Sequence, residues 1–147
     1  MTSRATEFQQ TFSLPFTNQS LITEALIAPG ITSREGNKSL AQIGDTVLQL
    51  ALQLEGRERG VSRERINNII SNRAGNANLA RRGFALGLDR FIRKNPSQGS
   101  FCSDRLMADT MEAIVGAYFE DRGREFAALK VVLDVLGLGW PEDGEEK

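Results

Sequence analysis

Residues 103–122 read SDRLMADTMEAIVGAYFEDR, and this stretch decides the fold. Between Leu106 and Phe119 only Asp109, Thr110 and Glu112 are polar, so a helix formed here is apolar nearly all round and belongs in the middle of a domain. Gly123 follows the stretch and is a suitable helix stop. The sequence therefore predicts a long central helix from Ser103 to Arg122.

A second buried helix is predicted from Asn37 to Glu55. One apolar stripe has the helical spacing 3, 4, 3, 4, and its members are Leu40, Ile43, Val47, Leu50 and Leu54. A second stripe, roughly opposite at 100° per residue, consists of Ala41, Asp45, Leu48 and Leu52. A helix that is apolar on two faces is expected between other helices.

The rest of the chain predicts shorter helices and no strands. We expect helices over residues 18–28, 62–71, 76–86 and 124–136, a turn bracketed by Gly56 and Gly60, and a loop over 93–100. The fold class is all-α, with six or seven helices in a single domain over residues 1–147. Its core is expected at about 18–138, followed by an acidic, disordered tail at 141–147.

Composition excludes several kinds of chemistry. The chain has no histidine, which rules out Ser-His and Cys-His catalysis and every zinc site that contains histidine. Its only cysteine is Cys102, so no internal disulfide can form. The N-terminus lacks an apolar secretory segment, and an intracellular, cytoplasmic protein is the default expectation. Hydrolytic chemistry must therefore use carboxylates, with a metal ion that they hold.

Charge is unevenly distributed along the chain. The net charge is −1, yet the stretch from Arg57 to Lys94 holds ten basic residues against three acidic ones. That stretch carries +7 and the remainder −8, the asymmetry expected of a phosphate-binding face beside an acidic metal site. Helix faces that are simply solvated give the same pattern, so charge alone leaves both interpretations open.

Three carboxylates interrupt the two buried helices. Asp109 and Glu112 are three residues apart and share a helix face, together with Gly116, which allows a close helix approach. Asp45 lies in the second stripe of the other helix. A carboxylate in an apolar row is unfavourable unless it is paired or binds a cation. Pairing with arginines is one explanation, and a Mg²⁺ or Mn²⁺ site formed by all three carboxylates is the other.

The motifs that carry these acids resemble those of the ribonuclease III family. Residues 37–48, NKSLAQIGDTVL, resemble its signature NERLEFLGDAVL, and residues 107–121, MADTMEAIVGAYFED, resemble its second motif LADTVEALIGAIYLDGG. Residues 78–80 and 87–92 are similar to the family's NLA and GLDxxI segments. The resemblance extends from about Leu21 to Leu138.

The resemblance implies the helical endonuclease fold of this family and cleavage of double-stranded RNA with Mg²⁺, for which Mn²⁺ substitutes. It implies a homodimer, and Asp45, Asp109 and Glu112 as metal ligands and catalytic residues. The expected products carry 5′-phosphate and 3′-hydroxyl ends. The chain is expected to stand alone, without the double-stranded-RNA-binding domain of many members. Candidate phosphate contacts are Arg63, Arg65, Arg73 and Arg105.

Three positions depart from the family pattern. Ala41 replaces the fourth carboxylate of the family's cluster, Lys38 replaces a further acid, and Gln42 replaces the aromatic residue that contacts the partner subunit. Water can replace one ligand, because Mg²⁺ usually keeps several waters. The sequence therefore favours an active enzyme. A catalytically silent RNA-binding or ribosome-associated subunit is the alternative, because such members of the family have lost cluster residues, and a helical protein with neither role is a third possibility.

Overall fold

A computed structural model describes residues 3–99 and 101–142. In this part of the chain every regular element is helical, apart from one isolated β-bridge between Ile27 and Arg93. Seven α-helices and two short 3₁₀ helices follow one another along the described residues. They are α1 (Arg4–Phe12), α2 (Gln19–Ala25), α3 (Lys38–Glu58), α4 (Arg63–Arg73), α5 (Asn76–Ala85), η1 (Leu88–Phe91), η2 (Pro96–Gln98), α6 (Asp104–Asp121) and α7 (Phe126–Leu136). The all-α prediction is confirmed.

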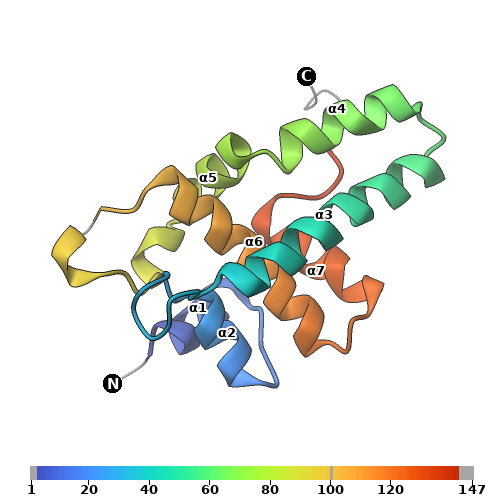
Figure 1. Ribbon diagram of the computed structural model, residues 1–147. Helices are drawn as coiled ribbons and strands as arrows, with labels where there is room; N and C mark the ends of the chain where they lie inside the picture. Colours follow the sequence, from blue (N-terminus) through green and yellow to red (C-terminus); the bar gives the residue numbers. More distant parts are fainter. Residues whose placement is uncertain (1–2, 100, 143–147) are drawn as a thin grey trace.

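Helix α6 occupies the centre of the molecule, where it crosses α3 (Figure 1). Nine consecutive residues of α6, from Thr110 to Tyr118, are buried. Helices α2, α5 and α7 also pack against α6, while α4 runs beside α3. The predicted central position of the 103–122 stretch is therefore confirmed, and its flanking Ser103 caps the helix by accepting a hydrogen bond from the Leu106 amide.

Two glycines allow α3 and α6 to cross at short range. A β-carbon at Gly44 would collide with the backbone carbonyl of Glu112, and one at Gly116 would collide with the carbonyl of Leu40. The predicted role of Gly116 in a close helix approach is confirmed. Because both collisions involve backbone atoms, neither can be relieved by moving a side chain.

The prediction of a turn between Gly56 and Gly60 is wrong at its first glycine. Helix α3 continues through Gly56 to Glu58, and the chain reverses at Gly60, whose φ of +75° favours glycine. A glycine is needed at this position of the helix because Ile66 of α4 and the ring of Trp140 occupy the space that a side chain would fill. Leu54, predicted in the apolar stripe, is 46% exposed and lines a surface hollow with Phe126 and Trp140.

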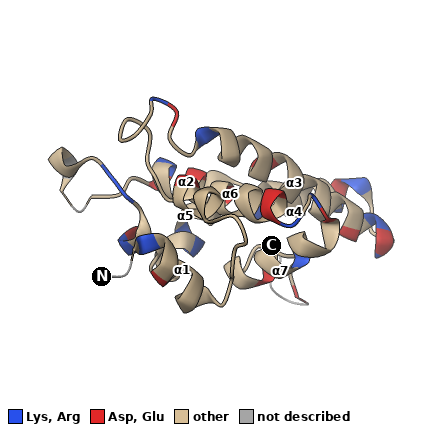
Figure 2. Cartoon of the chain, turned by 90° about the horizontal axis from the view of Figure 1, so that it is seen from below, with Lys and Arg blue, Asp and Glu red and all other residues tan. Residues whose placement is uncertain are grey.

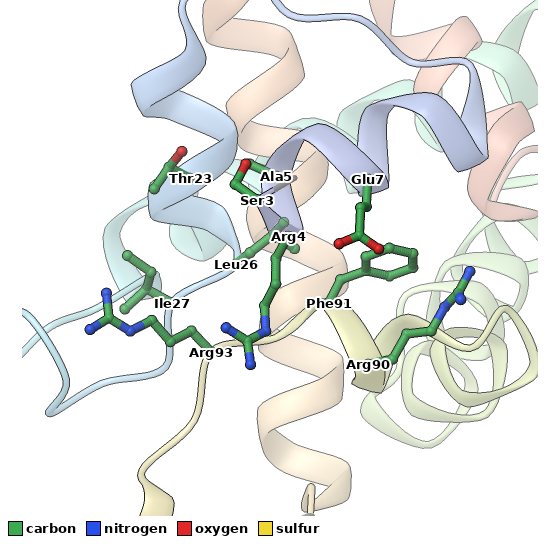
Figure 3. Close-up of a pocket in the computed structure, with 10 residues that line it drawn as sticks. All are labelled: Ser3, Arg4, Ala5, Glu7, Thr23, Leu26, Ile27, Arg90, Phe91 and Arg93. Carbon is green, nitrogen blue, oxygen red and sulfur yellow. The ribbon is translucent and has the colours of Figure 1, made fainter. Parts of the chain in front are cut away.

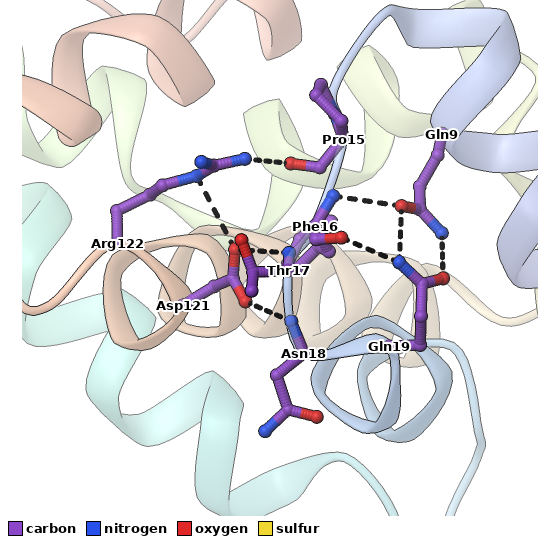
Figure 4. Close-up of polar contacts among 8 residues, drawn as sticks. All are labelled: Gln9, Pro15, Phe16, Thr17, Asn18, Gln19, Asp121 and Arg122. Carbon is purple, nitrogen blue, oxygen red and sulfur yellow. Dashed lines mark hydrogen bonds and ion pairs between the residues drawn. The ribbon is translucent and has the colours of Figure 1, made fainter.

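Helix α1 was not predicted. Ser3 caps it by accepting a hydrogen bond from the Thr6 amide, and Phe8 packs against Phe12 and against Phe91 of η1. The connection from α1 to α2 is held by the end of α6, as Figure 4 shows: Asp121 accepts hydrogen bonds from the Thr17 and Asn18 amides at 3.0 and 2.7 Å. The buried cluster thus includes residues before position 18.

The remaining boundaries agree with the predictions within a few residues. Asn18 and Ser62 cap α2 and α4 with their side chains, and Gly87, Gly123 and Gly137, all with positive φ, follow α5, α6 and α7. The predicted disordered tail lies largely outside the described residues, which end at Glu142. Within the described chain, no helix combines the length and apolar character that crossing a bilayer requires.

Candidate active site

The three predicted carboxylates come together where α3 crosses α6. Asp45, Asp109 and Glu112 line one hollow of about 310 Å³. The other residues that line this acidic hollow are Lys38, Ala41, Gln42, Ala74, Asn76 and Arg105. Sequence analysis anticipated the convergence of the acids, because each lies on the inward face of its helix. It did not assign a role at this site to Asn76 or Ala74, which come from the junction of α4 and α5.

A buried hydrogen-bond pair fixes the start of α3 against α6. Asn37 is 0% exposed and donates through Nδ2 to the backbone oxygen of Ala25, at 3.0 Å, and to Oγ1 of Thr110, at 3.1 Å. Thr110 is itself fully buried, between Asp109 and Glu112 in the sequence. A buried amide that loses its partners is destabilising. Asn37 therefore sets the position of α3 relative to the carboxylates of α6.

Glu112 is the most strongly perturbed acid of the site. Glu112 is buried, with a relative exposure of 8%. Burial raises the pKa of Glu112 to about 8, and a hydrogen bond with Asp45 and the charges of Asp45 and Asp109 add to the increase, while Arg105 opposes it. Without a cation, this carboxyl is therefore protonated at neutral pH. A perturbed acid with charged neighbours in a hollow is typical of a functional site.

The two other acids have polar partners. Oδ1 of Asp45 accepts a hydrogen bond from Nε2 of Gln49 at 3.0 Å. Oδ1 of Asp109 lies 3.6 Å from Nε of Arg105, one turn earlier on α6. The side chain of Arg105 is 74% exposed, so the pair contributes little to stability. Arg105 instead presents a guanidinium group to solvent at the edge of the acidic hollow.

The donor set of the acidic hollow suits a hard divalent cation. Three carboxylates supply oxygen ligands, which Mg²⁺ and Mn²⁺ prefer. Within residues 3–99 and 101–142, however, no three acidic or cysteine side chains are placed so that they could hold a metal ion as they stand. The residues fit the ion by the chemistry of their oxygen donors, and their side chains would have to reorient to bind it together.

The three positions of the first motif that depart from the family pattern also line the acidic hollow. Ala41 is 6% exposed and lines the acidic hollow one turn before Asp45, where it supplies no ligand. Lys38 and Gln42 also line the hollow, and both are exposed. Lys38 therefore places a positive charge beside the three acids.

The arginines proposed from the sequence do not form one group. Arg63 lines a separate hollow on α4, with Glu64, and Arg65 is exposed nearby. Arg73 is only 8% exposed, so its guanidinium does not offer a free surface to a phosphate. Of the four candidates, Arg105 alone adjoins the carboxylates. Figure 2 shows basic groups on α1, on the segment after η1 and near the α3–α4 connection, rather than over one continuous face.

Known proteins resemble the chain in fold and in sequence. Two solved structures of the ribonuclease III nuclease domain from Campylobacter jejuni superpose with TM-scores of 0.77 and 0.75; they are 21% and 22% identical, and each match covers 92% of this chain and 98% or 95% of the other. Ribonuclease 3 from Oleidesulfovibrio alaskensis is 36% identical over 124 residues, which are 78% of this chain and 52% of that protein. Ribonuclease 3 from Hahella chejuensis is 26% identical over 137 residues, 90% of this chain and 60% of that protein. No family model matches the chain.

The superpositions show that the chain has the same helical fold as these two solved domains. The chain is a nuclease domain of the ribonuclease III family, since sequences named Ribonuclease 3 match most of its length and the solved nuclease domains share its fold. It spans little more than half the length of these curated relatives.

Proposed function

We propose that the protein is a metal-dependent endoribonuclease that hydrolyses double-stranded RNA. The observation that carries the proposal is the convergence of Asp45, Asp109 and Glu112 on one hollow, where burial and mutual repulsion raise the pKa of Glu112 to about 8. A site that destabilises its own negative charge gains stability by binding a cation. The relatives named Ribonuclease 3 support RNA as the substrate.

Each acid has a distinct part in the proposed site. Asp45, held by Gln49, and Asp109 supply oxygen ligands for Mg²⁺ or Mn²⁺ from α3 and α6. Glu112 completes the set when its proton leaves. A metal ion bound there lowers the pKa of a coordinated water and neutralises charge on the phosphate oxygens. Arg105, released from Asp109, is placed to pair with a phosphate of the bound strand.

Three carboxylates in place of four favour weaker metal binding, not its loss. Ala41 leaves one side of the hollow without a ligand, and Mg²⁺ usually keeps several waters in its coordination shell. The expected products carry 5′-phosphate and 3′-hydroxyl ends, as the chemistry of the family implies. The competing function is a catalytically silent RNA-binding or ribosome-associated subunit, which the substitution of Ala41 for a carboxylate favours.

The test is incubation of the purified protein with long duplex RNA and Mg²⁺ or Mn²⁺, with EDTA as the control. We expect fragments with 5′-phosphate and 3′-hydroxyl ends under both metals and intact RNA in EDTA. Binding without cleavage under either metal, at enzyme concentrations in excess of the RNA, would establish the silent subunit instead.

RNA binding is expected to be weak and sensitive to salt, because the net charge is −1. We propose that Arg63 and Arg65 at the start of α4, with Arg105, bind phosphates of the duplex. Removal of one such arginine should reduce the slope of log affinity against log salt concentration by about one. The measurement is duplex binding in EDTA at several salt concentrations, for the parent and for Arg63→Gln. An affinity that salt does not change would contradict electrostatic binding by these residues.

We also propose that two copies associate. One of the similar structures is described as flexible in a region involved in dimer formation. In this chain, Leu54, Phe126 and Val131 are each between 46% and 48% exposed, and the polar Gln42 occupies the position of the family's aromatic contact. Full burial of an apolar side chain contributes roughly 1.5–3 kcal/mol, so the dimer should be weaker than one with an aromatic residue at that position. Sedimentation that shows only monomers at tens of micromolar protein would refute association.

A further inference from the structure

A second hollow, lined by other residues than the acidic hollow, has the features of an anion site. It measures about 660 Å³ and is lined by Arg4 of α1, Arg90 of η1 and Arg93 of the segment that follows η1 (Figure 3). None of its lining residues belongs to the acidic hollow. We call it the arginine hollow. Its volume lies within the range typical of sites for small ligands.

Backbone and ring contacts bring the segment of Arg90 and Arg93 against α1 and α2, although Arg4 is far from both in the sequence. The backbone of Arg93 exchanges hydrogen bonds with the segment after α2, from its amide to the Leu26 oxygen at 2.7 Å and from the Ala28 amide to its oxygen at 2.9 Å. Phe91 packs edge-on against Phe8 of α1 at 5.9 Å between ring centroids. The hollow is therefore a fixed feature of the packing of α1, α2 and η1.

In the part of the chain that the structure describes, the positive charges of the arginine hollow lack carboxylate partners. The ion pairs there involve other residues, and none joins Arg4, Arg90 or Arg93 to an acid. Among the described residues, Glu7 is the only acid that lines the hollow. Arg90 stacks over the ring of Phe91 at 4.5 Å, with its guanidinium group directed away from those of Arg4 and Arg93 (Figure 3). Three cations against one anion leave an excess of positive charge.

All three arginines are exposed, so solvent screens part of their repulsion, and a bound anion would relieve the rest. Like charges around one hollow repel each other, and the buried side chains of Leu26 and Phe91, each 2% exposed, line it with apolar surface that weakens solvent screening. The N-terminal turn of α1, from Ser3 to Ala5, also lines the hollow and adds the positive end of a helix dipole. Arginine forks match the oxygen geometry of phosphate and form charge-assisted hydrogen bonds with it.

We propose that the arginine hollow binds phosphate groups, either of a nucleotide or of an RNA strand, at a site separate from the carboxylates. Arg4 and Arg93 supply the direct contacts, and Arg90 adds charge from its stacked position. Glu7 opposes binding. The proposal does not depend on nuclease activity, because the two hollows have no residue in common.

The test uses inorganic pyrophosphate as the probe, titrated calorimetrically into the whole protein in EDTA, so that no metal occupies the acidic hollow. The double variant Arg4→Gln/Arg93→Gln should weaken pyrophosphate binding at least tenfold. The matched control Arg34→Gln/Arg57→Gln removes the same charge from exposed positions outside the hollow and should leave the affinity within twofold of the parent. Glu7→Gln should tighten binding several-fold, a change that damage to the fold cannot produce.

Competition identifies the source of the phosphate. Displacement of pyrophosphate by a nucleoside diphosphate indicates a nucleotide site, and displacement by a short RNA duplex indicates a strand site; either result supports the proposal. Pyrophosphate that does not saturate the parent, that binds both double variants equally, or that neither competitor displaces would overturn it. Because all titrations are free of metal, these failures are distinguishable from an absence of RNA cleavage.

Discussion

Replacement of Glu112 by glutamine should remove a large part of the pH dependence of stability. Glutamine has the shape of the protonated acid and cannot ionise. In the metal-free protein the pKa of Glu112 is raised to about 8 from its ordinary value of 4.5, because of burial first and Asp45 second. Between these two pH values the folded state holds a proton that the unfolded state has released.

The sign and the size of the effect follow from this difference. The contribution of Glu112 to folding is fully present below pH 4.5 and is lost as pH rises through about 8. Each tenfold difference in proton affinity between the folded and unfolded states corresponds to about 1.4 kcal/mol, so the free energy of unfolding should fall by up to about 5 kcal/mol over this range. Glu112→Gln should show no such decline. Its advantage over the parent should therefore be small at pH 5 and several kcal/mol at pH 8.5.

The assay is urea denaturation in EDTA at several pH values, with Glu58→Gln, an exposed acid at the end of α3, as the control. The control should keep the slope of the parent. Mn²⁺ should reverse the order at pH 8.5, because it stabilises the ionised acid of the parent and finds one ligand fewer in the variant. Parallel stability curves for parent and Glu112→Gln in EDTA would refute the reasoning that Asp45, Asp109 and Glu112 repel each other in one hollow.

Three further substitutions test the metal site, the helix crossing and the contact between α6 and the α1–α2 connection. Ala41→Glu should restore a fourth carboxylate, so half-maximal cleavage should need less Mg²⁺. EDTA should lower the melting temperature of the variant more than that of the parent, because the added carboxylate repels Asp45 when no metal is bound. If the responses to Mg²⁺ and to EDTA are both unchanged, Ala41 does not face the metal. Gly44→Ala places a methyl group against a backbone carbonyl of α6 and should destabilise the fold by about 2–3 kcal/mol or more, whereas Thr46→Ala, exposed on the same helix, should change the urea midpoint little. Asp121→Asn weakens two hydrogen bonds to the α1–α2 connection and should destabilise the fold by about 1–3 kcal/mol. The exposed Asp134→Asn should cause almost no change, and equal urea midpoints for these two variants would contradict the stabilising role of Asp121.

The helical periodicity of the sequence was enough to predict most of the helices. The two long helices and their close approach were predictable because apolar residues recur on more than one face of each and because Gly116 lies beside Glu112 on one helix face. Helix α1 was missed because its buried face consists of only two residues, Ala5 and Phe8, in a polar segment. The course of α3 through Gly56 depends on its contacts with Ile66 and Trp140, which local sequence does not reveal.

In the candidate site, too, some features could be predicted from the sequence and others depend on tertiary packing. The three acids could be predicted from their helix faces and from the motif resemblance. The pairing of Arg105 with Asp109 is a matter of side-chain orientation, which spacing leaves open. The arginine hollow could not be predicted at all, because Arg4 is more than eighty positions from Arg90 and the two meet through the packing of α1 against η1.

The central claim is that three carboxylates at the α3–α6 crossing form a metal-dependent ribonuclease site. The most direct measurement compares cleavage of long duplex RNA in Mn²⁺ by the parent and by Asp45→Asn, Asp109→Asn and Glu112→Gln, each confirmed to be folded. We predict cleavage by the parent that EDTA stops, and activity at least a hundredfold lower in each variant. Metal-dependent cleavage that survives in all three variants would contradict the claim.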